Sequence, residues 1–188
     1  FKVESQIIKK NPGFKLEKRN LLRHINYEKG TIELEGKEYK LLDKNFPTID
    51  PKKPYALTKE EEDIMERLER AFENCEKLQR HMHFLLNKGG LYKVYNGNLL
   101  YHGCVPLKED GNLKSVRIFG RSYKGKGLYE VLESYVRKGF YAMDPKEKER
   151  GKDIMWYIWL SENSPLFGKD KMATFERYFL AEKETHKE

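Results

Sequence analysis

A histidine follows a short apolar run in the stretch NLLYHGCVP, residues 98–106. The run is typical of a β-strand, and Gly103 permits a close backbone approach directly after His102. Such a strand presents an imidazole at its carboxyl end, where open sheets bind ligands, and a neutral imidazole suits divalent transition metals. The residues alone leave two interpretations of His102 open: a metal ligand, or a structural histidine at a strand end.

Three cationic side chains, Lys169, Lys171 and Arg177, lie in the stretch SPLFGKDKMATFERYF. The Ser-Pro dipeptide and Gly168 favour a loop there. Ammonium and guanidinium groups bind phosphate well, so the three residues are candidates for holding a doubly phosphorylated ligand. The same charges are also typical of an ordinary solvated surface.

The other histidines and the cysteines form no metal-binding pattern. His81 and His83 point about 200° away from each other if they lie on one helix. Cys75 falls on an apolar stripe and is expected in the core, and Cys104 lacks the paired spacing of a zinc site. His186 could approach a site from the end of the chain, but we expect an exposed tail residue.

An α+β fold is predicted to position these residues. Asn96-Gly97 is a strong hairpin signal, and further hairpins are expected around Glu35-Gly36 and Gly120. Two short helices should flank the Asn-Pro-Gly turn at residues 11–13. Two more helices are expected around residues 128–136 and 154–159, and the second is apolar on most sides and therefore buried.

The longest predicted element is one amphipathic helix over residues 58–88. Thr58 and Glu61 form a capping box at its start, and Gly89-Gly90 should end it. Apolar residues follow each other at helical spacing along one narrow stripe. We expect the stripe to pack within the molecule in preference to a coiled-coil dimer, with the helix lying against the sheet or projecting as an inserted arm.

The length and the net charge of the chain limit the number of domains and the kinds of partner that it can bind. The chain has 188 residues, enough for one domain, and a net charge of +7. The excess could attract nucleic acid, an anionic membrane or phosphorylated metabolites, but the basic residues are scattered and carry no RNA-binding signature. With two cysteines and no signal peptide or spanning run, we expect a cytoplasmic, reduced protein. Because residue 1 is Phe, we expect a piece of something longer.

Four longer stretches of the sequence are distinctive, in this order along the chain: FPTIDPKKPYALT, NLLYHGCVPL, WYIWLSENSPLFGKDKMATFERYF and KETHKE. With them the chain resembles the class III fructose-1,6-bisphosphatases of Firmicutes over residues 1–188. The resemblance implies a calcineurin-like metallophosphatase: a β-sandwich flanked by helices, with a two-metal site that is usually manganese. It also implies that His102 is a metal ligand and makes Lys169, Lys171 and Arg177 candidates for binding substrate phosphate.

The chain departs from the metallophosphatase pattern in one respect. Asp-x-His, Gly-Asp-x-x-Asp-Arg-Gly and Gly-Asn-His-Asp are absent, and Gly97-Asn98 and Gly111-Asn112 lead into leucine. We therefore expect residues 1–188 to be a single internal portion of a longer enzyme, inactive alone and without retained metal. Its catalytic residues are unknown.

The resemblance implies a specific reaction for the parent enzyme, the hydrolysis of fructose 1,6-bisphosphate to fructose 6-phosphate and phosphate in gluconeogenesis. The expected partners are this small-molecule substrate and the rest of the parent chain, with no nucleic acid or membrane. A homo-oligomer is possible, because exposed strand edges favour pairing. The alternative is a non-catalytic interaction or regulatory module that binds a partner through the long helix, or a phosphorylated metabolite through the cationic loop.

Overall fold

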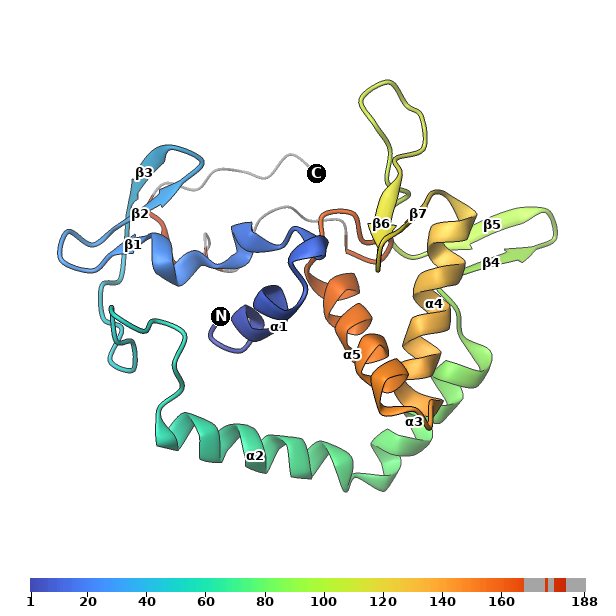
Figure 1. Cartoon of the computed structure of the whole chain (residues 1–188), viewed down its shortest axis with the longest axis horizontal. Helices are drawn as coiled ribbons and strands as arrows, with labels where there is room; N and C mark the ends of the chain where they lie inside the picture. Colours follow the sequence, from blue (N-terminus) through green and yellow to red (C-terminus); the bar gives the residue numbers. More distant parts are fainter. Residues whose placement is uncertain (168–174, 176–177, 182–188) are drawn as a thin grey trace.

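A computed structural model of the chain describes residues 1–167, 175 and 178–181. It shows an α+β fold of helices and small antiparallel sheets, as predicted. In chain order the elements are α1 (Glu4–Lys10), η1 (Pro12–Phe14), η2 (Glu17–Arg19), η3 (Leu21–His24), β1 (Ile25–Asn26), β2 (Thr31–Leu34), β3 (Lys37–Lys40), α2 (Lys59–Glu73), α3 (Glu76–Lys88), β4 (Tyr92–Tyr95), β5 (Asn98–Tyr101), β6 (Val116–Ile118), β7 (Arg121–Tyr123), α4 (Lys126–Tyr141) and α5 (Pro145–Leu160). Figure 1 shows β1–β3 at one end, α4 and α5 with the later hairpins at the other, and α2 along the lower edge.

The hairpins form at the turns that the sequence predicts. β4 pairs with β5 through a turn in which Asn96 has φ 48° and Gly97 has φ 74°. Phe119 at φ 43° and Gly120 at φ 86° make the same kind of turn between β6 and β7. Positive φ at both central positions matches the twist of the flanking strands. The described sheets have three, two and two strands, so a larger β-sandwich would need strands from outside the described residues.

α4 and α5 cross at a pair of glycines, Gly139 and Gly151. A Cβ atom added to Gly151 would lie 2.1 Å from the Gly139 nitrogen and 2.3 Å from its Cα. The two backbones therefore approach closely, and a side chain at either position would hold the helices apart. Around this crossing lies the larger core, built from Ile8, Phe14, Leu16, Val116, Ile118, Leu128, Leu132, Ile154, Tyr157, Ile158 and Leu160. The prediction of a buried α5 is confirmed, although Trp159 is exposed.

A second core lies against the sheet β1–β3. Leu41, directly after β3, forms a β-bridge with Leu180, and the Leu42 N–H donates to the Phe179 carbonyl at 2.7 Å. Phe175 and Leu180 are each 1% exposed and pack in this core. Residues near the end of the chain thus complete the packing of a sheet formed near its beginning.

The single helix predicted over residues 58–88 is wrong, because α2 ends at Glu73 and α3 begins at Glu76. The Arg70 carbonyl accepts the Asn74 backbone N–H at 3.0 Å and also the Asn74 side-chain amide at 2.8 Å, a local side-chain bond that competes with continuation of the helix. Cys75 follows in an extended conformation with φ −83° and ψ 95°. The break changes the direction of the apolar stripe, so Cys75 is exposed and not in the core as predicted.

The apolar stripe of α2 is also not covered in the way the sequence predicts. The capping box is confirmed, since Thr58 and Glu61 exchange both hydrogen bonds. Yet no residue of α2 is buried against the described part of the chain, and Leu68 and Phe72 are 48% and 61% exposed. Among the residues that the structure describes, no helix has the length and apolarity to cross a bilayer.

The helix expected after residues 11–13 is replaced by three short 3₁₀ helices, η1–η3. Lys15 adopts the left-handed conformation with φ 55°, which ends η1. Asn20 stands between η2 and η3 with a non-helical ψ of 62°. These two residues stop an α-helix from continuing, although the apolar spacing would allow one.

Candidate functional site

His102 follows directly after β5 and is exposed. The hairpin register, with Tyr92 opposite Tyr101, places it where the strand leaves the sheet. This position agrees with the prediction of a histidine at the carboxyl end of a strand. An exposed imidazole is able to reach a ligand or an ion from another part of a larger protein.

The backbone after His102 is packed against a turn that lies about sixty residues later in the chain. The Cys104 N–H donates to the Pro165 carbonyl at 3.1 Å. A Cβ atom on Gly103 would lie 2.3 Å from the Pro165 oxygen and 2.6 Å from the Leu166 oxygen. Gly103 therefore allows the close approach that the sequence predicts, and the group that it accommodates is the backbone of residues 165–166.

The turn at residues 161–167 is rigid enough to act as a support for this segment. Ser164 is fully buried, and its Oγ accepts hydrogen bonds from the N–H groups of Leu166 at 3.1 Å and Phe167 at 3.3 Å. The Ser164 N–H itself donates to the Ser161 carbonyl at 3.1 Å. A short turn with its polar groups satisfied in this way holds one conformation.

α4 fixes the same segment from the other side. The Tyr129 hydroxyl donates to the Cys104 carbonyl at 2.8 Å, and the Cys104 thiol donates to the Ser164 carbonyl at 3.3 Å. Burial raises the pKa of the Cys104 thiol, so the sulfur stays protonated at neutral pH and is a poor metal ligand. Burial likewise raises the pKa of Tyr129, which keeps its hydroxyl available as a donor. Sequence analysis missed Tyr129, since no local pattern marks it, whereas Ser164 stood in the predicted Ser-Pro turn.

Only one of the predicted site residues lies in the described part of the chain. Lys169, Lys171, Arg177 and His186 all fall outside the described residues. In sequence, Lys169 and Lys171 come shortly after Phe167, the last described residue of the turn that supports Gly103. The structure thus brings His102 next to the segment that precedes two of the predicted cations.

A metal ion needs more donors than His102 supplies. Within the described residues no three His, Cys, Asp or Glu side chains are grouped to hold a metal ion. The exposed imidazole of His102 is chemically suitable as one ligand. The described residues therefore do not by themselves form a two-metal centre.

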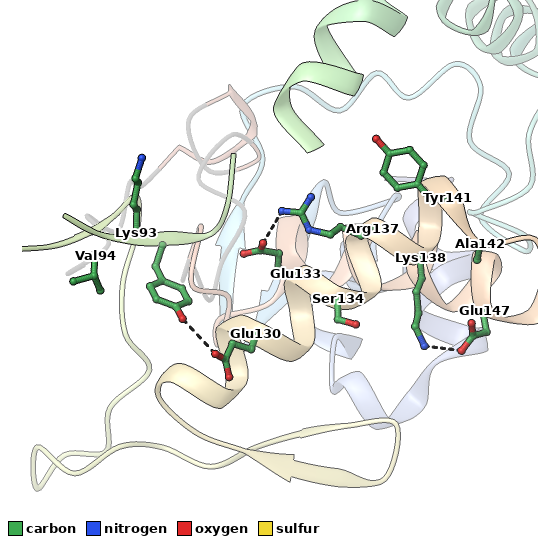
Figure 2. A pocket seen from close by; sticks show the side chains of 11 residues that line it. Lys93, Val94, Glu130, Glu133, Ser134, Arg137, Lys138, Tyr141, Ala142 and Glu147 are labelled. Carbon is green, nitrogen blue, oxygen red and sulfur yellow. Dashed lines mark hydrogen bonds and ion pairs between the residues drawn. The ribbon is translucent and has the colours of Figure 1, made fainter. Parts of the chain in front are cut away.

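One hollow among the described residues has no contribution from His102 in its lining. It has a volume of about 920 Å³ between β4 and α4 and is shown in Figure 2. Arg137 is paired with Glu133 at 2.7 Å, and Lys138 with Glu147 at 2.6 Å. Because carboxylates already neutralise these cations, this hollow is poorly suited to a sugar bisphosphate.

A second, apolar hollow of about 500 Å³ lies under the β4–β5 hairpin, on the same side of β5 as Tyr101. Its lining comes from one face of the hairpin, the start of α4 and the loop after β5, namely Tyr92, Val94, Leu99, Tyr101, Val105, Leu113, Gly125, Lys126 and Tyr129. The hairpin also exposes large apolar side chains, with Val94 62% and Leu99 56% exposed. This end of the molecule is therefore unusually apolar for a free surface.

Comparison with known proteins identifies the family. The family model described as "Firmicute fructose-1,6-bisphosphatase" matches residues 1–188. The chain is 54% identical over 189 residues to "Fructose-1,6-bisphosphatase class 3" of Clostridioides difficile (strain 630), covering 100% of this chain and 29% of that protein. The proteins of the same name from Clostridium botulinum (strain Loch Maree / Type A3) and Alkaliphilus metalliredigens (strain QYMF) are 54% and 53% identical, again over 100% of this chain and 28% and 29% of their own lengths.

The chain thus spans less than a third of the length of these relatives. No solved structure matches it. The match along the whole of residues 1–188 shows that the chain belongs to the Firmicute fructose-1,6-bisphosphatase family.

Proposed function

We propose that the protein of which this chain forms a part hydrolyses fructose 1,6-bisphosphate to fructose 6-phosphate and phosphate, as a step of gluconeogenesis. The observation that carries the proposal is the family match over the entire chain, together with relatives that bear this name. The proposed location is the cytoplasm, where the two free cysteines would stay reduced.

In this proposal His102 is one ligand of a divalent metal, which we take to be manganese. Bound metal ions of this kind hold a phosphate group and lower the pKa of a bound water. The contribution of the described residues is positional: the hairpin presents the imidazole, and the contacts of Gly103 and Cys104 fix the backbone beside it. Rigid placement of a ligand within a fraction of an ångström is what such a site requires.

Lys169, Lys171 and Arg177 are proposed to bind the substrate phosphates. A guanidinium can bind two phosphate oxygens at once, and the two ammonium groups add charge. The catalytic acid, base and remaining metal ligands would come from polypeptide outside these 188 residues. The chain alone is therefore proposed to be inactive and to retain no metal.

Substitution of His102 in the full-length protein tests the proposal. We expect His102→Ala to lower the manganese-dependent phosphatase activity at least about 100-fold and to reduce the bound metal per chain, since even groups that support a ligand contribute about 10–100-fold. His24→Ala is the matched control, because His24 is also exposed and lies on η3. Unchanged activity and metal content in His102→Ala would remove this residue from the site.

A further inference from the structure

The α2–α3 arm, residues 59–88, exposes an apolar surface along its first helix. Ile64, Met65, Leu68 and Phe72 of α2 are between 41% and 61% exposed. Met65, Leu68 and Phe72 line a hollow of about 630 Å³ together with Leu57, and its lining also includes Glu62, Glu66 and Glu69. Figure 1 shows α2 lying along the edge of the molecule, away from α4 and α5. An isolated helix of 15 residues is marginal in water, so α2 requires a partner for this surface.

The second helix of the arm exposes an apolar surface with the opposite charge around it. Its inner side is used within the molecule, since Leu86 is buried and the His83 ring contacts the Phe140 ring of α4 at 5.0 Å. Its outer side leaves Phe84 and Leu85 65% and 58% exposed. Cations lie along the same helix at Lys77, Arg80 and Lys88, against one acidic residue, Glu76.

Charge distinguishes the two helices clearly. α2 carries seven acidic and three basic side chains, whereas α3 carries one acidic and three basic ones. Pairing α2 with another α2 would bring acidic side chains together, which is unfavourable. Pairing α2 with an α3 matches both the apolar side chains and the charges.

We propose that two copies of the protein associate through this arm, with α2 of each copy packed against α3 of the other. Such an arrangement has a two-fold axis, and both apolar surfaces are then covered by the same contact made twice. A second copy is preferred to an unrelated partner because the complementary surface is present on the chain itself. The inference is independent of the proposed activity.

The arm is held in place before it associates. The Lys2 ammonium is paired with Glu61 at the start of α2 at 2.7 Å and also donates to the Thr48 carbonyl at 2.6 Å. At the other end α3 contacts α4 through the ring contacts of His83 with Phe140 and Tyr141. A surface that is already ordered loses less conformational entropy on binding.

Light scattering coupled to size-exclusion chromatography of the full-length protein tests the proposal. We expect a dimer whose dissociation constant rises with salt and rises at least about 10-fold in Glu62→Lys/Glu69→Lys and in Lys77→Glu/Arg80→Glu. Combining all four substitutions should restore the dissociation constant to within about threefold of the original, because the charges are then exchanged between the two helices. Circular dichroism and phosphatase activity, which these exposed residues are not expected to change, report on folding.

Either of two results would overturn the proposal. One is a protein that stays monomeric at every concentration while amides of α2 are protected from hydrogen exchange, which would mean that another part of the same polypeptide covers the stripe. The other is a dimer that the double variants leave intact or that the fourfold exchange fails to restore.

Discussion

α4 and α2 have almost the same length and the same kind of amphipathic pattern, yet their surroundings are opposite. In α4, Leu128 and Leu132 are fully buried in the core around α5, whereas Leu68 on the apolar stripe of α2 is 48% exposed. The difference lies in the partner and not in the helix. An apolar stripe shows that a helix has a face to cover, and the rest of the fold decides whether this chain covers it.

The sharpest test of this contrast is the glycine crossing of α4 and α5. Gly151→Ala should lower the free energy of unfolding by about 3 kcal/mol, because the added methyl would lie 2.1 Å from the Gly139 nitrogen and the helices would have to separate. Chemical denaturation measures the change. Gly127→Ala in α4 is the control, since nothing lies within 4 Å of its Cβ, and its stability should stay the same or rise slightly.

Shortening one leucine on each helix compares the two regions directly. We expect Leu132→Ala to cost about 2.5 kcal/mol of unfolding free energy, because it leaves a cavity at a side chain that is 0% exposed. Leu68→Ala should change the stability of the dissociated protein by less than about 0.5 kcal/mol. Equal losses in thermal or urea unfolding would show that α2 is covered as completely as α4.

The segment of His102 and Gly103 is intermediate between the buried α4 and the exposed α2. The His102 side chain is exposed, whereas the Gly103 backbone is tightly packed. Gly103→Ala should cost about 2 kcal/mol, since its methyl would lie 2.3 Å from the Pro165 oxygen. The full-length enzyme should also lose phosphatase activity, because the imidazole next to Gly103 would shift. Gly13→Ala, with nothing within 4 Å of its Cβ, is the control. Full activity in Gly103→Ala would show that the backbone contact does not position the site.

The smallest effect concerns the ion pair that anchors α2. The hydrogen bond from Lys2 lowers the pKa of Glu61 to about 2 from its ordinary value. A lowered pKa means that the stabilisation is fully present above the pKa of the unfolded chain and is lost as the pH falls toward 2. Because Glu61 is partly exposed, we expect about 1 kcal/mol.

Urea unfolding at pH 6 and at pH 3 measures this contribution. The unmodified protein should lose more stability between the two pH values than Lys2→Met, in which the pair is already broken. Identical losses would show that the pair does not contribute to anchoring α2.

Local signals in the sequence predicted the local structure well. The turns at Asn96-Gly97 and Gly120 formed as expected, because Asn and Gly adopt positive φ at little cost. The Thr58 capping box also formed as expected. By contrast, the helix breaks at Asn74 and Cys75, where Cys75 turns extended, and the apolar periodicity contains no sign of this break.

The site was predictable in part. His102 and Gly103 were identified as candidates from the sequence alone. The group that Gly103 accommodates is the backbone of a turn after α5, and no local sequence pattern predicts that contact. Tyr129 was missed because a tyrosine on a helix is more often part of a core. The remaining metal donors could not be predicted at all, since the motifs that usually supply them are absent from these 188 residues.

Diffraction from manganese-loaded crystals of the full-length protein, recorded at a wavelength where manganese scatters anomalously, tests the central proposal most directly. We expect a manganese ion within coordination distance of a ring nitrogen of His102, with its other ligands from polypeptide outside this chain. A manganese centre that is remote from His102, with the imidazole directed into solvent, would contradict the account.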